Sequence, residues 1–472
     1  MSRIFISATR KSSGKTTFAV GLCAALRNRG IDVQPFKKGP DYIDPMWLSR
    51  VSDRPCINLD FNSMTREEML WSFVRHQPEN GISVIEGNKG LFDGLDLYGS
   101  DSNAALAKML NVPIILVVDV EGMTRGIAPL IQGYLAFEPE IKISGLVLNN
   151  LGGARHESKL RDIVKYYTDL ELLGVIQRNP GLKIVERHLG LTTDKEDAGR
   201  QSHIQAMTEA VETQINIDRI IELAGVSGEL TASSPRIEKQ SPLPVSIGIA
   251  RDSAFCFYYA DDIEAMEQYG ATIRYFDTLN DGGLPDVDAI FIGGGFPETH
   301  GELLEKNVSM RNAIRDFAES GRPVYAECGG LMYLSRKIRW QGKTREMVGA
   351  IPADVDMHER PIGRGYVLLE PTSDHPWLGR NDNHSSAEIK AHEFHYSNLS
   401  DLDPSIRFAY RVKRGHGVDG EYDGIVHGSV FANFAHMRDS RANPWVSRFL
   451  DAVHHSVASR AFPIKKQATT NL

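Results

Sequence analysis

The sequence has few cysteines and no long apolar stretch, and these two shortages exclude several classes of protein. Its four cysteines, at positions 23, 56, 256 and 328, form no Cys-x-x-Cys pair and no Cys/His metal spacing. A disulfide framework or a structural zinc site is therefore not expected. The longest apolar run, residues 112–118, falls far short of the roughly 20 residues that span a bilayer.

An excess of positive charge and an apolar leader are also lacking. Lys and Arg number 53 against 61 Asp and Glu, a formal net charge of −8. Such a surface does not attract nucleic acid or anionic lipid as a whole. The apolar stretch at residues 4–6 is too short for a secretory signal. We therefore expect a cytoplasmic protein that acts on small molecules, without nucleic acid or membrane partners, and a homodimer stays open.

Short β-branched runs alternate with helical patterns in the first half of the chain. The runs lack polar alternation, which is typical of strands buried on both faces of a parallel sheet. The sequence thus predicts a doubly wound α/β domain over residues 1–226. Its expected strands are 4–7, 33–36, 82–85, 114–118 and 143–148, and its expected helices are 15–29, 66–75, 103–110 and 156–167.

Residues 227–244 are small, polar and proline-rich, which predicts a linker. A second α/β domain is expected over 245–460, followed by a disordered tail at 461–472. The expected strands of this domain are 245–250, 272–276, 289–292 and 324–327, then the shorter 348–350, 365–369, 389–395, 408–412 and 425–431. Its expected helices are 260–269 and 445–457.

A phosphate-binding loop is indicated between the first strand and the first helix. There the chain reads Ala-Thr-Arg-Lys-Ser-Ser-Gly-Lys-Thr-Thr, ending at Thr17. Backbone N–H groups at such a helix start favour anions. Gly14 would shape the loop, Lys15 would neutralise phosphate charge, and Thr16 would reach Mg²⁺. Thr9 stands where the usual pattern has its first glycine.

Acidic loops follow the next two strands. Asp41 and Asp44 come after the second strand, and Glu86 and Asp93 after the third. The carboxyl ends of parallel strands line one crevice, so these loops are expected to face the phosphate loop. Glu86 suits a Mg²⁺ contact, because Mg²⁺ takes one or two carboxylates together with phosphates. The alternative is that Asp41 and Asp44 only build a turn between two prolines.

A strand runs directly into Cys328 and two glycines before a helix. This order is typical of a nucleophile elbow, where a tight turn projects a reactive side chain. The helix start behind it would favour the thiolate. The turn containing Gly294 and Gly295 follows the preceding strand and could supply an oxyanion hole.

Nucleophilic cysteines need a base, usually a histidine. The candidates are His392, His395, His427 and His436, and position alone does not choose among them.

Taken together, these segments resemble the cobyrinic acid a,c-diamide synthase family over nearly the whole chain. The matching motifs are Lys-Gly-Pro-Asp-Tyr-Ile-Asp-Pro, Glu-Gly-x-x-Gly-Leu-Phe-Asp-Gly, Gly-Gly-Phe-Pro-Glu, Ala-Glu-Cys-Gly-Gly-Leu-Met-Tyr-Leu and His-Glu-Phe-His-Tyr-Ser. The resemblance implies an N-terminal ATP domain of the dethiobiotin-synthetase type. It also implies a C-terminal class I glutamine amidotransferase domain with a flavodoxin-like α/β fold.

The resemblance further implies roles for particular residues. Cys328 would attack glutamine, with His436 as its base. ATP would be a co-substrate, and a tetrapyrrole polycarboxylate and L-glutamine would be the other small-molecule substrates. The implied nucleotide site is Gly14, Lys15, Thr16, Thr17, Asp41, Asp44 and Asp93, and the implied Mg²⁺ ligands are Thr16, Asp41 and Glu86.

Three departures from the family pattern bear on these roles. They are Thr9 in the phosphate loop, the pair Asn88-Lys89 after Glu86, and Arg438 in the place two residues after the histidine where triad enzymes have an acid. The last departure leaves either a Cys–His dyad or an acid placed elsewhere.

Three readings of the function remain beside amidation of cobyrinate in cobalamin biosynthesis. Amidation of siroheme or nickel-sirohydrochlorin would use the same chemistry. A P-loop ATPase switch with an inert second domain would leave Cys328 unused. A thiol hydrolase with an inactive phosphate loop would leave Lys15 unused.

Overall fold

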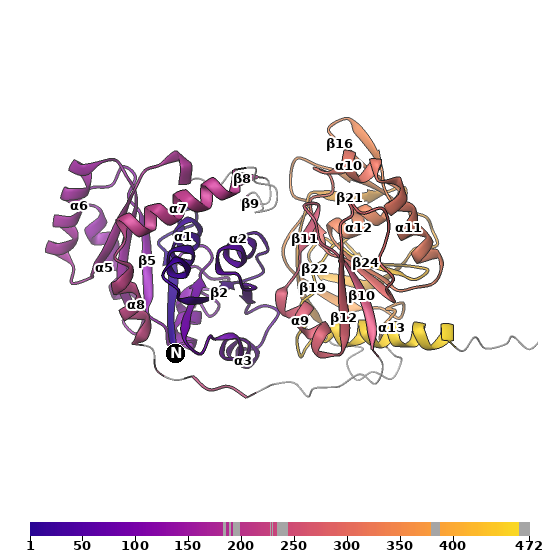
Figure 1. Ribbon diagram of the computed structural model, residues 1–472, viewed down its shortest axis with the longest axis horizontal. Helices are drawn as coiled ribbons and strands as arrows, with labels where there is room; N and C mark the ends of the chain where they lie inside the picture. The colour runs from indigo at the N-terminus through magenta and orange to yellow at the C-terminus, as the bar shows by residue number, and fades with distance from the viewer. Residues whose placement is uncertain are drawn as a thin grey trace, which may run out of the picture. The chain divides into compact units, whose positions relative to one another are not determined.

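The chain forms two compact units in a computed structural model, one spanning Met1–Pro235 and the other Arg236–Leu472 (Figure 1). The structure describes residues 1–182, 186–187, 190–191, 199–226, 228, 230–233, 244–378 and 388–461. The predicted linker, 227–244, and the predicted tail, 461–472, lie largely outside these residues. Among the described residues, no helix is both long and apolar enough to cross a bilayer.

The first unit is built on a parallel sheet of seven strands in the order β3-β2-β4-β1-β5-β6-β7. Most of their side chains are buried, which explains the β-branched runs without polar alternation. All five predicted strands are present. The strands are β1 (Ser2–Ala8), β2 (Asp32–Lys38), β3 (Ile57–Leu59), β4 (Gly81–Glu86), β5 (Ile114–Asp119), β6 (Ile143–Leu151) and β7 (Leu172–Gln177).

Helices connect these parallel strands, as the expected doubly wound architecture requires. A capping box formed by Thr65 and Glu68 starts α3. The helices are α1 (Lys15–Asn28), α2 (Ile43–Ser52), α3 (Arg66–His76), α4 (Asn103–Met109), α5 (Ile127–Phe137), α6 (Ala154–Tyr167), α7 (Arg200–Gln214) and α8 (Ile217–Gly225). A 3-10 turn (Pro180–Leu182) and a small hairpin of β8 (Glu186–Arg187) and β9 (Gly190–Leu191) complete the unit.

The second unit contains a mixed sheet of nine strands in the order β12-β10-β13-β15-β24-β23-β22-β19-β20. Pairing is parallel from β12 to β24 and antiparallel from β24 to β20. The strands are β10 (Val245–Ala250), β12 (Ala271–Phe276), β13 (Ala289–Ile292), β15 (Val324–Glu327), β19 (Gly363–Pro371), β20 (Ile389–His395), β22 (Arg407–Arg414), β23 (Tyr422–His427) and β24 (Val430–Asn433).

A smaller sheet, in the order β17-β16-β18-β21, and a short β11·β14 ladder accompany the main sheet. Their strands are β11 (Phe255–Phe257), β14 (Gly294–Gly295), β16 (Lys337–Trp340), β17 (Lys343–Glu346), β18 (Asp354–Met357) and β21 (Ser397–Ser400). The helices are α9 (Ala260–Gln268), α10 (Gly301–Lys306), α11 (Val308–Glu319), α12 (Gly329–Leu334) and α13 (Trp445–Ala461).

Two predicted strands of this unit are wrong. Residues 348–350 form a loop whose N–H groups at Val348 and Gly349 donate to the carbonyls of Tyr333 and Ser335 rather than to a strand. Residues 425–431 form the inner part of a hairpin, because the chain reverses at Gly428 and splits the run into β23 and β24. Gly428 takes φ +58°, a conformation that suits glycine at a tight turn.

Candidate functional site

The phosphate loop lies between the end of β1 and the start of α1. Gly14 takes φ +90°, and a Cβ there would lie 2.1 Å from Nδ2 of Asn149, so only glycine fits. The Asn149 amide donates to the carbonyl of Ser13 at 2.9 Å and fixes this approach. The N–H of Thr9 donates to the carbonyl of Val117, and the φ angle of Thr9 is not positive. The backbone at Thr9 therefore does not require the glycine that the usual pattern has there.

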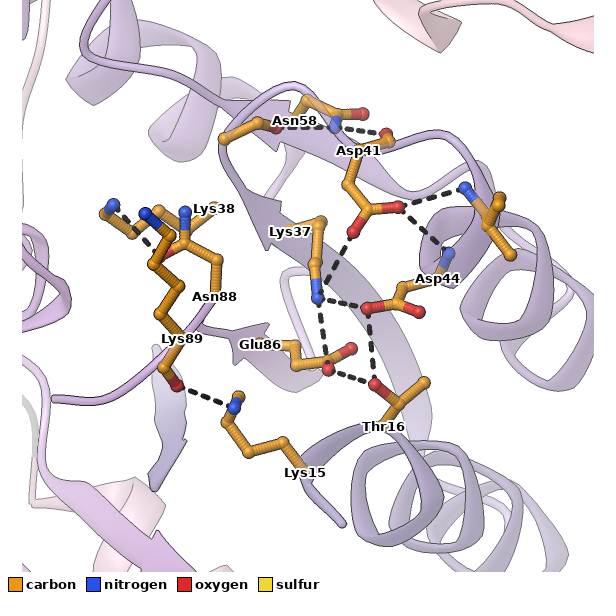
Figure 2. A network of polar contacts seen from close by, with 12 residues as sticks. Lys15, Thr16, Lys37, Lys38, Asp41, Asp44, Asn58, Glu86, Asn88 and Lys89 are labelled. Carbon is orange, nitrogen blue, oxygen red and sulfur yellow. Dashed lines mark hydrogen bonds and ion pairs between the residues drawn. The ribbon is translucent and has the colours of Figure 1, made fainter. Parts of the chain in front are cut away.

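Lys37 lies at the centre of an acidic cluster beside this loop (Figure 2). Its ammonium pairs with Asp44, lies 3.1 Å from Oε1 of Glu86 and 3.7 Å from Oδ2 of Asp41. The Thr16 hydroxyl donates to Glu86 at 2.7 Å and to Asp44 at 3.2 Å. The structure thus brings Thr16, Asp41, Asp44 and Glu86 together around an ammonium that the sequence analysis did not single out.

Burial and crowding shift the pKa values of this cluster. Burial would lower the pKa of Lys37, but Asp44, Glu86 and Asp41 outweigh it and raise that pKa well above its usual value. Burial raises the pKa of Glu86 to about 7, although Lys37 opposes the shift. Burial and the neighbouring Lys37 lower the pKa of Lys15 to about 8. The cluster therefore holds carboxylates that a second cation would readily keep ionised.

Asp41 has two contacts that explain its position. Its Oδ1 accepts the N–H groups of Ile43 and Asp44, which caps the start of α2. Its Oδ2 faces Lys37. Surrounding protein and the charge of Asp44 raise its pKa to about 6, although 34% of the side chain is exposed. Asp41 therefore helps to build the turn, which was the alternative that the sequence left open, and it also belongs to the acidic cluster.

The loop after β4 contains two residues that depart from the family pattern, and one of them, Lys89, contacts the phosphate loop through Lys15. Lys89 has φ +36°, and its carbonyl accepts a hydrogen bond from the Lys15 ammonium at 2.6 Å (Figure 2). Asn88 accepts from the Lys38 ammonium at 3.2 Å. Asp93 is exposed and accepts the N–H of Gly90 at 2.8 Å, which stabilises this loop. No contact of Asp93 with the phosphate loop itself is seen among the described residues.

A cavity of about 610 Å³ opens from the phosphate loop within the same unit. Besides Gly14, Lys15, Thr16 and Thr17, it is lined by residues that the sequence analysis missed. A signal for some of them was present, because they lie at or just after the carboxyl ends of β5, β6 and β7, where ligands of parallel sheets bind, although the sequence did not predict β7. These residues include Asp119, Asn149, Asn150, Arg178 and Asn179.

Cys328 lies in a strained turn between β15 and α12. It takes φ +46° without being glycine, and its N–H donates to the carbonyl of Asn433 at 2.7 Å. A Cβ at Gly330 would lie 2.0 Å from the Ile292 carbonyl oxygen, which explains the glycine after the elbow. The helix that follows has only six residues, so the dipole that the sequence predicts is a short one.

His436 is the candidate histidine that contacts Cys328. Burial would lower its pKa, but the neighbouring Cys328 and the Glu327 carboxylate raise it to about 10. His392 instead pairs with His436 through the backbone, at 2.7 and 3.3 Å. His395 stacks on Phe434, with 4.1 Å between ring centroids.

The two glycines predicted to form an oxyanion hole lie close to these residues. A Cβ at Gly294 would lie 2.4 Å from Cε1 of His436, and one at Gly295 would lie 1.9 Å from the Ala254 carbonyl oxygen. The backbone N of Gly295 in turn lies 3.0 Å from the position of a Cβ on Gly329. The glycine turn is therefore packed against both the histidine and the elbow.

The acid expected two residues after the histidine is absent. Arg438 occupies that place, pairs with Asp261 and lies over the Tyr259 ring at 4.5 Å. An acid at the end of β15 approaches the ring instead: Oε2 of Glu327 lies 3.4 Å from Nδ1 of His436. Glu327 belongs to the Ala-Glu-Cys motif, but the sequence alone gives no sign of a role for it.

The two sites together define a class of protein. Residues 4–191 match the family model described as the CobQ/CobB/MinD/ParA nucleotide binding domain. Residues 246–443 match the CobB/CobQ-like glutamine amidotransferase domain. The chain is thus a glutamine-hydrolysing ligase that joins a nucleotide-binding domain, with ATP as co-substrate, to an amidotransferase domain.

Similar proteins narrow this class. The cobyrinate a,c-diamide synthase of Magnetococcus marinus is 46% identical over 449 residues, which cover 94% of this chain and 95% of the relative. That of Methanosarcina acetivorans is 38% identical over 489 residues, covering 97% of each chain. The chain belongs to the cobyrinate a,c-diamide synthase family. The predicted family, the α/β fold of both domains and the class of enzyme are thereby confirmed.

Proposed function

We propose that this protein amidates the a and c acetate carboxylates of cobyrinate in cobalamin biosynthesis, with ATP and with ammonia taken from glutamine. The observation that carries the proposal is the presence in one chain of two sites that need each other. One has the phosphate loop and acidic cluster of an activating site, and the other has a cysteine elbow beside a histidine. The name of the relatives supports cobyrinate as the acceptor.

The proposed functional units are an ATP-binding amide synthase domain at 1–226 and a glutaminase domain at 245–460, with small molecules as partners. We place the protein in the cytoplasm, where ATP and glutamine are available. The oligomeric state, including a homodimer, stays a matter for measurement. Siroheme or nickel-sirohydrochlorin as acceptor has no support in the comparisons. The two other rivals each leave one of the two sites without a use.

The phosphate loop is the proposed nucleotide site. Gly14, Lys15, Thr16 and Thr17 would cradle the phosphates, since they line one cavity at a helix start. Asp44 and Asp93 complete the proposed set. Asp44 accepts a hydrogen bond from the Thr16 hydroxyl, and Asp93 stabilises the loop that contacts Lys15.

The residues beside this loop fit a Mg²⁺ ion. Thr16 and Glu86 present oxygens to one spot, and Oε2 of Glu86 is buried with no hydrogen-bond partner among the described residues. The described part of the chain has no cluster of three or more His, Cys, Asp or Glu arranged as a metal cage. Mg²⁺ prefers one or two carboxylates together with phosphate oxygens. Thr16, Glu86 and Asp41 would hold the ion, which supplies Lewis-acid polarisation of the phosphates.

The first half-reaction would activate a carboxylate. An acetate oxygen of the acceptor attacks the γ-phosphorus of ATP, and the bond to the β,γ-bridging oxygen breaks, giving an acyl phosphate and ADP. Lys15, which lines the cavity, would place positive charge where phosphate charge shifts during this step. Ammonia then attacks the acyl carbon and phosphate leaves, which produces the carboxamide.

The second half-reaction would release that ammonia. The Cys328 thiolate attacks the side-chain carbonyl carbon of glutamine, and Gly294 and Gly295 are the proposed oxyanion hole. His436 donates its proton to the departing nitrogen as the C–N bond breaks. Water, deprotonated by the same ring, then cleaves the thioester to glutamate and thiolate.

Product mass tests this proposal. Purified protein is incubated with ATP, Mg²⁺ and glutamine, and cobyrinic acid and siroheme are offered in parallel. Each amidation replaces a hydroxyl by an amino group and lowers the product mass accordingly. We expect two such steps on cobyrinic acid with the wild type. In Cys328→Ala we expect none with glutamine and full recovery with added ammonia. A change on siroheme alone, or on neither acceptor, would contradict the proposal.

A further inference from the structure

The histidine of the proposed glutaminase site lacks its usual acidic partner in the sequence. Arg438 stands two positions after His436, and its guanidinium is turned to Asp261 and the Tyr259 ring. An imidazole without a fixed partner on one nitrogen can rotate or take the wrong tautomer, and either change disables it as a proton carrier. The structure therefore has to supply another group to hold this ring.

We infer that Glu327 is this group: a positioning residue that orients His436 and stabilises its charged form beside Cys328. The inference rests on the proposed function, because it assigns a partner within the same glutaminase site. Its geometric basis is the 3.4 Å separation between Oε2 of Glu327 and Nδ1 of His436, with both side chains at most 5% exposed. A buried carboxylate at that distance is an effective partner for an imidazolium.

The Glu327 carboxylate is itself fixed. Its Oε1 accepts the Tyr325 hydroxyl at 2.7 Å and the N–H of Met437 at 3.0 Å. The amide of Asn433 donates to the Tyr325 hydroxyl at 3.1 Å. With Oε1 occupied by two donors, Oε2 is the oxygen turned to the histidine. Hydrogen bonds thus join Asn433, Tyr325 and Glu327, and the remaining carboxylate oxygen of Glu327 faces Nδ1 of His436 at 3.4 Å.

Strand pairing explains why the acid can come from this place. β15 and β24 are parallel neighbours, and Glu327 is opposite Asn433 in the register. The chain continues from Asn433 through a short loop to His436, whose backbone pairs with His392. Glu327 and Tyr325 are two residues apart, so they project from the same face of β15. The last residue of the strand therefore faces the histidine, and the next residue is the nucleophile.

Within the described part of the chain, few other charged or titratable groups face the His436 ring. Cys328 contacts it from the elbow, and His392 on β20 lies 6.5 Å away between ring centroids. Arg438 is directed to Asp261 instead. Glu327 is the acid whose charge raises the pKa of His436 alongside the neighbouring Cys328. Removing that charge should lower this pKa and shift the pH range in which the ring can donate a proton.

Glu327→Gln tests the inference, with Glu393→Gln as the matched control. Glu393 is also a buried glutamate beside a histidine: it accepts the N–H groups of His416 and Gly417 and lies 3.7 Å from His395. The control therefore makes the same chemical change in the same domain without touching His436. Glutamate release from glutamine and ammonia-driven amidation are measured across pH for both variants. The rate of Cys328 alkylation by iodoacetamide, against a Cys328→Ala blank, needs no acceptor.

In Glu327→Gln we expect glutamine hydrolysis to fall at least about tenfold, since replacing a triad aspartate by its amide costs about 10⁴ in kcat. The alkaline limb of its pH profile and of Cys328 alkylation should move to lower pH, while ammonia-driven amidation stays intact. Glu327→Asp should recover part of the rate, and Glu393→Gln should keep the wild-type profile.

Two results would overturn the inference. One is a pH profile of Glu327→Gln that superimposes on the wild type. The other is an equal loss of glutamine- and ammonia-driven activity in both glutamine variants, which would mark a structural role. Failure of the proposed function is separate, because it would appear as glutamine-driven activity that survives Cys328→Ala.

Discussion

The ammonium of Lys37 and the carboxylate of Glu86 form a fully buried ion pair, with 3.1 Å between Nζ and Oε1 and exposures of 2% and 0%. Lys37 is the last residue but one of β2 and Glu86 ends the neighbouring β4, where the two residues are directly opposite in the register. The pair therefore results from the parallel sheet itself. The ion pair places charge at the edge of the sheet where β1 ends and the phosphate loop begins.

Replacing Lys37 by Met should destabilise the protein strongly. The change leaves Asp44 and Glu86 without their central counter-charge, and breaking a buried pair typically costs about 3–5 kcal/mol. We expect a lower urea midpoint with an unchanged m-value. Lys108→Met removes an exposed partner of Glu140 and should leave the midpoint unchanged. Equal effects of the two variants would show that the buried pair has no special weight.

Binding of Mg²⁺–ATP should be strongest between pH about 7 and about 8, because Glu86 must be ionised and Lys15 charged. The pKa of Glu86 is about 7 and that of Lys15 about 8. Affinity measured by calorimetry should rise up to the first value and fall above the second. Glu86→Gln should abolish the acid-side rise. A flat profile in the wild type would contradict these shifts.

The raised pKa of Glu86 also affects the stability of the protein without nucleotide. Glu86 has a folded-state pKa above its usual 4.5, so the folded state binds the proton more tightly than the unfolded state. The contribution of Glu86 is therefore full below pH about 4.5 and is lost as pH rises to about 7. Urea titrations of the wild type and Glu86→Gln over this range should diverge with increasing pH. Parallel curves would rule the effect out.

Gly294→Ala should impair glutamine hydrolysis selectively. The new Cβ would lie 2.4 Å from Cε1 of His436 and must displace the ring. A misplacement of about 1 Å can cost about 10²-fold in rate. Ammonia-driven amidation should persist. Gly283→Ala is the control, because nothing lies within 4 Å of its Cβ position.

Asn149→Ala should raise the KM for ATP about tenfold, the equivalent of one lost hydrogen bond of about 1.4 kcal/mol. The Asn149 amide fixes the carbonyl of Ser13 and lines the cavity beside Gly14. Basal glutamine hydrolysis should stay unchanged, which separates a local effect from misfolding. An unchanged KM would show that the loop keeps its shape without this bond.

The sequence predicted the alternation of strands and helices in the first unit. A strand that is buried on both faces of a parallel sheet is apolar along most of its length, so its own residues identify it. Elements that depend on single side chains were missed. Helix α2 starts where the Asp41 carboxylate caps it, and a carboxylate between prolines also suits a turn. The run at 425–431 has two apolar residues at each end, so the pattern predicts one strand through the short His-Gly-Ser segment between them, although the chain reverses there.

The site could be predicted where its residues are neighbours in the sequence. Lys15 and Thr16 are neighbours at the start of α1, and two glycines follow Cys328, so the local pattern predicted that each lies in a turn between a strand and a helix. The link between Glu327 and His436 joins residues 109 positions apart through strand pairing, and spacing alone gives no sign of it. The same holds for Lys37, because a lysine within an apolar strand gives no hint of the carboxylates that surround it.

Glu327 and Cys328 are consecutive residues, whereas His436 comes from a different strand end. The distance between thiol and carboxylate is thus covalently limited and hardly changes when the elbow moves. A small slide of β15 against β24 would carry both groups away from the imidazole at once. Because β15 and β24 are paired inside the nine-stranded sheet, one strand ladder fixes both groups relative to the imidazole.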